Sequence, residues 1–176
     1  MWEIKGVKQK INNSQTRERN ASYPLEIPYR LINMYSQQGD MVLDPFLGLG
    51  TTTIAAMLTG RNSIGVDIDK ALEPSIRNNI EELQIDMLNG IIAERYNKHL
   101  SFIKEREAQG KEVKYEYFNL MCKVMTSQEV YINLYYLDNI MPKTDKTLTY
   151  ECTYFDDVAI NEYVSNDKNA LSLRYD

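Results

Sequence analysis

Residues 41–52 read MVLDPFLGLGTT, and this stretch indicates both the fold and the kind of site that the chain carries. Its apolar start is typical of a strand, which ends in an acid, Asp44. Two glycines, Gly48 and Gly50, follow in a tight loop, and a helical pattern begins at Thr51. The stretch therefore predicts a strand, a loop and a helix N-terminus, where backbone N–H groups can face a small polar ligand.

A second apolar stretch, residues 63–66, reads SIGV and also ends in an acid, Asp67. It predicts a second strand, joined to the first by a helix that starts at Thr51 and stops at Gly60. Two strands with a helix between them and an acid at each strand end form half of a nucleotide-type binding crevice.

Length and composition restrict the class of protein. The chain has 176 residues, 43% of them hydrophobic and 26% charged, which predicts one domain or one domain with an appendage. Its apolar runs are far shorter than the roughly 20 residues that span a bilayer, and its first residues lack a signal-peptide core. We therefore expect a cytoplasmic protein with no membrane partner. The two cysteines and one histidine lack metal-ligand spacing, so we expect no metal site.

Charge is distributed unevenly along the chain. The net charge of −5 argues against a basic surface over the whole molecule, yet residues 1–30 carry six lysines and arginines against three glutamates. This basic segment could lie near nucleic acid, or it could be an ordinary solvated face, and both interpretations stay open.

Helical patterns flank the two predicted strands. A helix is expected after the two prolines that precede residue 30. Downstream, Asp69 is a predicted N-cap, and helical spacing continues to about Gln109 with Gly90 and Gly110 as candidate breaks.

The pattern changes after Gly110. Residues 113–118, 130–137 and 147–155 are rich in aromatic and β-branched side chains and predict two or three antiparallel strands. We place a boundary near residue 110, between a ligand-binding region over 1–109 and a tyrosine-rich β extension over 110–176. The tyrosines fit half-buried strand packing or, alternatively, base stacking.

The glycine loop departs from the common nucleotide motifs. Gly48-x-Gly50 resembles the start of a dinucleotide fingerprint, but its third position is Thr53. The loop holds no lysine and no Gly-Lys-Ser/Thr follows, which disfavours ATP and GTP. Asp44 lies where a diphosphate would be repelled, and its charge suits a ligand that is positive near the loop.

S-adenosylmethionine has the charges that this loop requires. Its ammonium group can face Asp44 while its carboxylate faces the amides around Gly50 and Thr51. Asp67 is placed to accept hydrogen bonds from both ribose hydroxyls. A structural interpretation also stays open, in which Asp44 caps the turn and the glycines only supply positive φ.

These segments resemble the DNA amino-methyltransferases, which modify cytosine N4 or adenine N6. Residues 44–52 are similar to that family's cofactor motif, Asp-Pro-Phe-x-Gly-x-Gly-Thr-Thr; residues 60–69 resemble its next strand, and residues 19–28 its aromatic-proline segment. The resemblance implies an α/β chain with a partial Rossmann-like class I methyltransferase fold, followed by a C-terminal helix and an antiparallel strand extension. It implies that S-adenosyl-L-methionine is held by Tyr23, Pro24, Asp44, Phe46, Gly48, Gly50, Thr51, Thr52 and Asp67.

One family motif is missing from the sequence. The resemblance implies a catalytic Asp/Ser-Pro-Pro-Tyr/Trp motif that holds the target amino group and a flipped base, but all five prolines here are isolated. We therefore expect the cofactor-binding part of a DNA methyltransferase, with the catalytic motif on a second chain or a missing half. Two alternatives are a non-catalytic remnant that serves as a binding or structural module, and an enzyme that acts on a substrate other than DNA.

Overall fold

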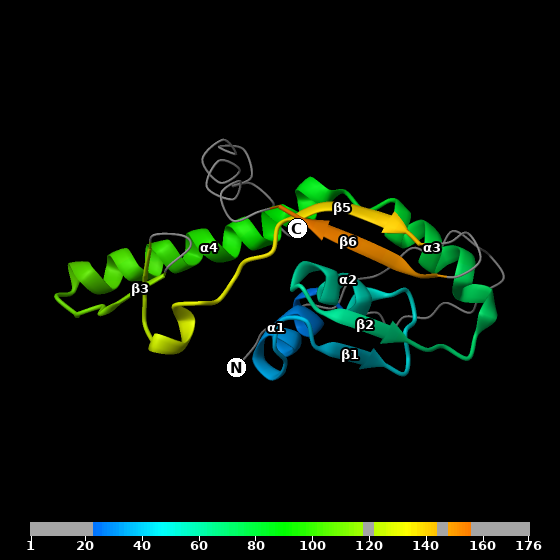
Figure 1. The fold of residues 1–176 in the computed structure, drawn as a ribbon, viewed down its shortest axis with the longest axis horizontal. Helices are drawn as coiled ribbons and strands as arrows, with labels where there is room; N and C mark the ends of the chain where they lie inside the picture. The colour runs from blue at the N-terminus through cyan, green and yellow to red at the C-terminus, as the bar shows by residue number, and fades with distance from the viewer. Residues whose placement is uncertain (1–22, 118–121, 144–147, 156–176) are drawn as a thin grey trace. The chain divides into compact units, whose positions relative to one another are not determined.

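The computed structural model describes residues 23–117, 122–143 and 148–155 (Figure 1). The chain divides into two compact units, which are described separately. The first unit comprises Met1–Gln84 with Asn139–Cys152, and the second comprises Ile85–Asp138 with Thr153–Asp176. Helices and strands occur in both, as expected for a chain of mixed α/β class.

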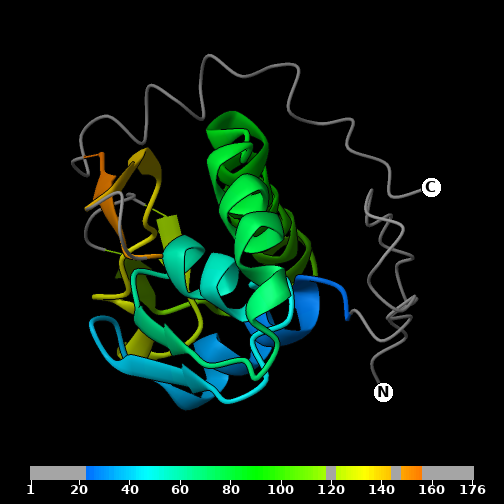
Figure 2. The ribbon, with the colours of Figure 1, turned by 90° about the vertical axis from the view of Figure 1, so that its right-hand side faces the viewer.

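The first unit is built around the predicted strand–helix–strand motif. Strand β1 (Met41–Asp44) pairs in parallel with β2 (Asn62–Gly65), so that Leu43 faces Ile64 across the ladder. Helix α2 (Thr51–Leu58) connects them and packs on the strands (Figures 1 and 2). The predicted strands and the helix beginning at Thr51 are thus confirmed.

Helix α1 (Glu26–Tyr35) packs against α2 through small side chains. Ala55 and Ala56 on α2 are fully buried beside Ile32 of α1. Because alanine adds little bulk, the two helices approach closely, which places the start of α1 near the loop after β1.

The segment after β2 begins with the predicted cap. The Asp69 side chain accepts a hydrogen bond from the N–H of Ala71 at 3.1 Å, at the start of the 3₁₀ turn η1 (Lys70–Leu72). Helix α3 (Glu73–Glu81) follows directly. Its Ile76 and Ile80 share a buried cluster with Met57 and Leu72, so this helix completes the core beneath the glycine loop.

The long helical pattern breaks earlier than the sequence predicts. Helix α3 ends at Glu81 and α4 (Ile85–Ala108) begins after a three-residue interruption, while Gly90 lies buried inside α4. Gly90 as a break is therefore wrong. The apolar residues before the break pack in the first unit, and those of α4 belong to the second.

The second unit contains α4 and the two short strands that follow it directly, β3 and β4, together with the first two residues of β5 and the last two of β6. The helix ends at Ala108, and Gly110, two residues further on, has a φ of +69° that supports the predicted stop. Strands β3 (Tyr115–Tyr117) and β4 (Cys122–Val124) pair antiparallel, followed by the 3₁₀ turn η2 (Ser127–Glu129). The strand predicted over residues 113–118 is thus present in a shorter form as far as residue 117, and residue 118 lies outside the described residues.

The prediction of a strand over residues 130–137 is wrong. Only Leu137 joins a strand, because β5 (Leu137–Pro142) begins there, and the preceding residues are irregular. Their aromatic character serves packing instead: Tyr136 is fully buried, and the rings of Tyr135 and Tyr154 meet edge to face at 5.0 Å. The buried Asn89 side chain exchanges hydrogen bonds with the backbone N–H and C=O of Leu137, both at 2.8 Å.

The last predicted strand is confirmed within the described residues. Strand β6 (Tyr150–Tyr154) pairs with β5, and the two run antiparallel (Figure 1). Residue 147, where the prediction began, lies outside the described residues.

Candidate cofactor-binding site

The candidate site lies in the first unit, where the carboxyl ends of β1 and β2 meet the glycine loop. The Val66 N–H donates to the Asp44 carbonyl at 2.8 Å, and the Leu47 N–H donates to the Val66 carbonyl at 2.9 Å. A Cβ on Gly65 would collide with the Leu47 side chain. The loop is therefore seated on the end of β2, and Asp44, the last residue of β1, lies at the same edge of the sheet as Asp67, two residues after β2.

Asp44 connects three parts of the site. One carboxylate oxygen accepts the Phe46 N–H at 3.0 Å, and the other accepts the Tyr23 hydroxyl at 3.3 Å. The Tyr23 hydroxyl also lies 2.7 Å from the Thr52 hydroxyl, in the first turn of α2. Asp44 thus caps its local turn, as the structural interpretation expects, and it also links the segment before α1 to the start of α2.

Burial raises the pKa of the Tyr23 phenol above its usual value of 10. The hydrogen bond with Thr52 opposes this effect, and the neighbouring Asp44 charge adds to it. At neutral pH Tyr23 is therefore a protonated donor that can orient the Asp44 carboxylate.

Asp67 holds the loop from the other side. One of its oxygens accepts the Gly48 N–H and the other accepts the Asp69 N–H, both at 2.9 Å. The carboxylate is half-buried. It lies at the strand end where a ribose-binding acid is predicted, and it is already oriented by two backbone donors.

The two glycines make the loop geometry possible. Gly48 has φ +54° and Gly50 has φ +84°, both in the left-handed region that disfavours side chains. Gly50 is the N-cap of α2 and supplies no side-chain cap, so the first N–H groups of the helix, from Thr51 onward, have no side-chain acceptor from that position. Such a helix start favours an anionic group.

Two apolar side chains flank the loop in the open. Phe46 is 83% exposed and Ile68 is 97% exposed. Ile68 was not among the predicted site residues, although its sequence position, an apolar residue directly after the acid Asp67, is a usable signal. Exposed apolar residues beside polar groups are typical of a ligand site.

Hydrogen bonds join some of the predicted site residues to one another. Hydrogen bonds join Tyr23, Asp44 and Thr52, and another joins Gly48 to Asp67. Pro24 lies beside the site because it follows Tyr23 in the chain. Its carbonyl accepts the Ile27 N–H at 3.0 Å, in the turn that enters α1.

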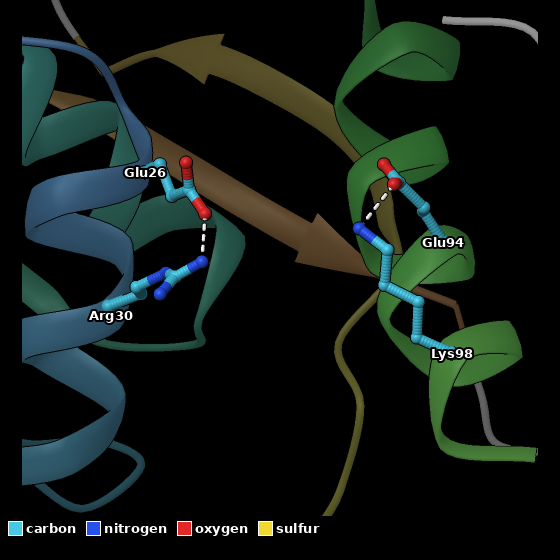
Figure 3. Close-up of polar contacts among 4 residues, drawn as sticks. All are labelled: Glu26, Arg30, Glu94 and Lys98. Carbon is cyan, nitrogen blue, oxygen red and sulfur yellow. Dashed lines mark hydrogen bonds and ion pairs between the residues drawn. The ribbon is translucent and has the colours of Figure 1, made fainter. Parts of the chain in front are cut away.

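Basic side chains on the helices are partly neutralised. Arg30, the one described member of the basic segment over residues 1–30, pairs with Glu26 on α1, and on α4 Lys98 pairs with Glu94 (Figure 3). The other basic residues of that segment lie outside the described residues, so its predicted nucleic-acid role stays a prediction.

Comparison with known proteins gives the family. The family model described as DNA methylase, for N6 and N4 methyltransferases, matches residues 1–78. The type II methyltransferase M.MthZI of Methanothermobacter thermautotrophicus is 45% identical over 149 residues, which is 84% of this chain and 39% of the relative. The chain belongs to the DNA amino-methyltransferase family.

Other methyltransferase relatives match shorter parts. M.MjaI of Methanocaldococcus jannaschii is 55% identical over 80 residues, which is 46% of this chain and 26% of the relative. A solved structure described as a putative DNA modification methylase from Thermus thermophilus, in complex with S-adenosyl-L-methionine, is 43% identical over 34% of this chain and 26% of that chain, with a TM-score of 0.32.

The matches cover only part of each relative, and one of them extends past residue 109 of this chain. The chain spans between about a quarter and two fifths of the length of these two curated relatives. An alignment of 149 residues cannot fit within residues 1–109, so the similarity to M.MthZI extends into residues 110–176.

No helix in the described part of the chain is both long and apolar enough to cross a membrane. Over residues 23–117, 122–143 and 148–155, no group of three or more His, Cys, Asp or Glu side chains could hold a metal ion.

Proposed function

We propose that this chain is the S-adenosylmethionine-binding part of a site-specific DNA methyltransferase that modifies cytosine N4 or adenine N6. One observation carries the proposal: Asp44 and Asp67 hold opposite sides of a lysine-free glycine loop that opens onto the start of α2. Membership of the amino-methyltransferase family supports the choice of cofactor and of DNA as substrate.

The ammonium and the carboxylate of the cofactor each have a counterpart among these residues. Asp44 would face the ammonium group, and the amides at Gly50 and Thr51 would face the carboxylate. Asp67 would accept the ribose hydroxyls, and the exposed side chains of Phe46 and Ile68 offer apolar surface for the adenine. When bound, the cofactor supplies an electrophilic methyl group on its sulfonium.

The chain's own residues would act by binding and orientation. Tyr23 and Thr52 would fix the Asp44 carboxylate through their hydroxyl groups, and Pro24 would set the entry of Tyr23. The functional division at residue 110 stays part of this proposal, with the binding residues on the 1–109 side.

Catalysis would need groups that this sequence lacks. No Pro-Pro-Tyr/Trp motif occurs in it, so a further segment or a second chain would hold the target base in line with the sulfonium. That part would also complete a class I methyltransferase sheet, because two parallel strands rarely suffice for a stable sheet. Cytoplasmic location and the absence of a metal belong to the same proposal.

Calorimetry on the purified chain tests cofactor binding. We expect saturable heat with S-adenosylmethionine and with S-adenosylhomocysteine, and none with ATP. An Asp44→Ala variant should lose most of the heat, whereas Asp86→Ala, on the exposed start of α4, should retain it. Absence of heat with the wild-type chain would favour a non-catalytic remnant.

A methyl-transfer assay on unmethylated DNA tests the need for a catalytic part. We expect no transfer by this chain alone, and transfer after addition of the portion of M.MthZI that this chain does not span. Transfer by the chain alone would show that it carries its own catalytic groups.

A further inference from the structure

The Asp67 carboxylate has a role that precedes any ligand. Its two oxygens accept the N–H groups of Gly48 and Asp69, each at 2.9 Å. The Gly48 contact spans 19 residues and joins the middle of the glycine loop to the second residue after β2. It therefore ties together two segments that no local turn connects.

The contact acts beside other hydrogen bonds of the loop, among them the one that the Asn79 side-chain amide donates to the Leu49 carbonyl at 2.8 Å. Leu47 donates to Val66, and Gly50 donates to Leu47, but Gly48 donates to the Asp67 side chain. Gly48 also occupies the left-handed region at φ +54°, where a glycine has wide conformational freedom. A charged acceptor on its N–H restrains the peptide that joins Leu47 to Gly48, at the point where the loop turns toward the start of α2.

We propose that Asp67 is a positioning residue that fixes the glycine loop, so that the amides at Gly50 and Thr51 are aligned before the cofactor's amino-acid end arrives. This inference rests on the proposed function and adds a second role to the same carboxylate. Asp67 then serves the adenosine end directly and the amino-acid end through Gly48. A carboxylate oxygen has two lone pairs, so one oxygen can accept both a backbone N–H and a ribose hydroxyl.

Two ligands separate these roles. S-adenosylhomocysteine carries the adenosine and the amino-acid end, whereas 5′-methylthioadenosine carries the adenosine without the amino-acid end. A residue that contacts only the ribose contributes equally to both ligands. A residue that also positions the loop contributes more to S-adenosylhomocysteine, so the ratio of the two affinities reports the positioning role.

Asp67→Glu is the sharpest variant, because it keeps the charge and moves the carboxylate outward by one methylene. We expect its affinity for S-adenosylhomocysteine to fall about tenfold, the effect of losing one charge-assisted hydrogen bond. Its affinity for 5′-methylthioadenosine should change less than about threefold, since the longer acid can still reach a ribose. Asp67→Asn should lower both affinities, and that for S-adenosylhomocysteine more.

Asp40→Glu is the matched control. Asp40 also accepts a backbone N–H, that of Gln37 at 2.7 Å, but it lies at the other end of β1. Its substitution should leave the affinity ratio unchanged even where it lowers stability. Hydrogen exchange of ligand-free protein gives a second readout: the peptide over residues 45–50 should exchange faster in Asp67→Asn than in wild type.

The outcomes distinguish the two proposals. If wild type binds both ligands and the ratio is the same in Asp67→Glu, the positioning role is wrong while the proposed function stands. If wild type binds neither ligand, the proposed function is wrong and the inference falls with it. Equal loss of both affinities with a lowered Tm would make Asp67 a structural and ribose-binding residue only, which also overturns the inference.

Discussion

The hydroxyl of Tyr23 is the smallest feature of the site that can be tested alone. It donates to Asp44 and lies within hydrogen-bonding distance of Thr52. Tyr23→Phe removes it and keeps the ring, so the Asp44 carboxylate loses a donor that fixes its direction. We expect the affinity for S-adenosylmethionine to fall about threefold to tenfold, since a hydrogen bond to a charged group is involved and the site is partly exposed.

Calorimetry would measure this loss, with Tyr35→Phe as the control. Tyr35 is 78% exposed at the end of α1 and is not a predicted site residue. Equal affinity in Tyr23→Phe and wild type would mean that the Asp44 carboxylate is oriented by its own turn alone.

Gly50 offers a second test at the scale of one residue. Its φ of +84° costs an alanine about 1 kcal/mol. An added Cβ would meet Ile76 only at an ordinary contact distance of 3.7 Å. The substitution therefore acts through the backbone, and we expect Gly50→Ala to lower the unfolding free energy modestly and cofactor affinity about tenfold or more.

Gly39 provides a matched control for Gly50. It has the same φ of +84°, lies in the turn before β1 and has nothing near its missing Cβ. Urea unfolding should show similar destabilisation in Gly39→Ala and Gly50→Ala, and calorimetry should show loss of binding in Gly50→Ala only. Equal cofactor binding by both variants would mean that the loop amides do not bind the cofactor.

At the scale of elements, the sequence predicts the features that depend on local signals and misses those that depend on tertiary packing. The start of α2 and the Asp69 cap follow from loop and cap residues, and both are present as predicted. The break at residues 82–84 and the irregular path of 130–136 have no such local signal. Both features depend on which hydrophobic cluster each apolar side chain joins. That choice is made in the folded chain and cannot be read from the sequence.

The same distinction holds for the site. Asp44 and Asp67 are predictable because an acid ends each apolar strand. The bonds from Tyr23 to Asp44 and from Gly48 to Asp67 join residues 21 and 19 positions apart. They depend on how α1 and β2 approach the loop, so only the folded chain brings them together.

The contact between α4 and β4 predicts how stability depends on pH. Burial raises the pKa of Tyr96 on α4 to about 12, and the charge and hydrogen bond of Cys122 on β4 add to the effect. The unfolded chain releases this proton near pH 10, so between pH 10 and about 12 the folded state still binds a proton that the unfolded state has lost. Stability should therefore fall as pH rises from 10 to about 12.

Urea unfolding over that pH range would measure this dependence. Tyr96→Phe should reduce the slope of unfolding free energy against pH, because the variant has no phenol to ionise there. Tyr131→Phe, which removes a phenol that is 78% exposed, is the control. An unchanged slope in Tyr96→Phe would mean that other groups account for alkaline destabilisation.

At the scale of the whole molecule, the division into two compact units predicts where a ligand stabilises the chain. All the proposed binding residues lie within Met1–Gln84, in the first unit, whereas α4 belongs to the second. At about 100 times its Kd, a ligand adds about 2.7 kcal/mol to the unfolding free energy of the cooperative unit that holds its site. If the two units open independently, that gain should stay within the first unit.

Hydrogen exchange with and without S-adenosylhomocysteine would test this independence. Peptides over residues 41–52 and 62–69 should exchange more slowly when the ligand is bound, and so should the peptide over 139–142, which belongs to the same unit although it follows α4 in the chain. Peptides within α4 should be unchanged. Equal protection of α4 would mean that the two units unfold together, and the chain would then behave as one cooperative body with the site as part of a single fold.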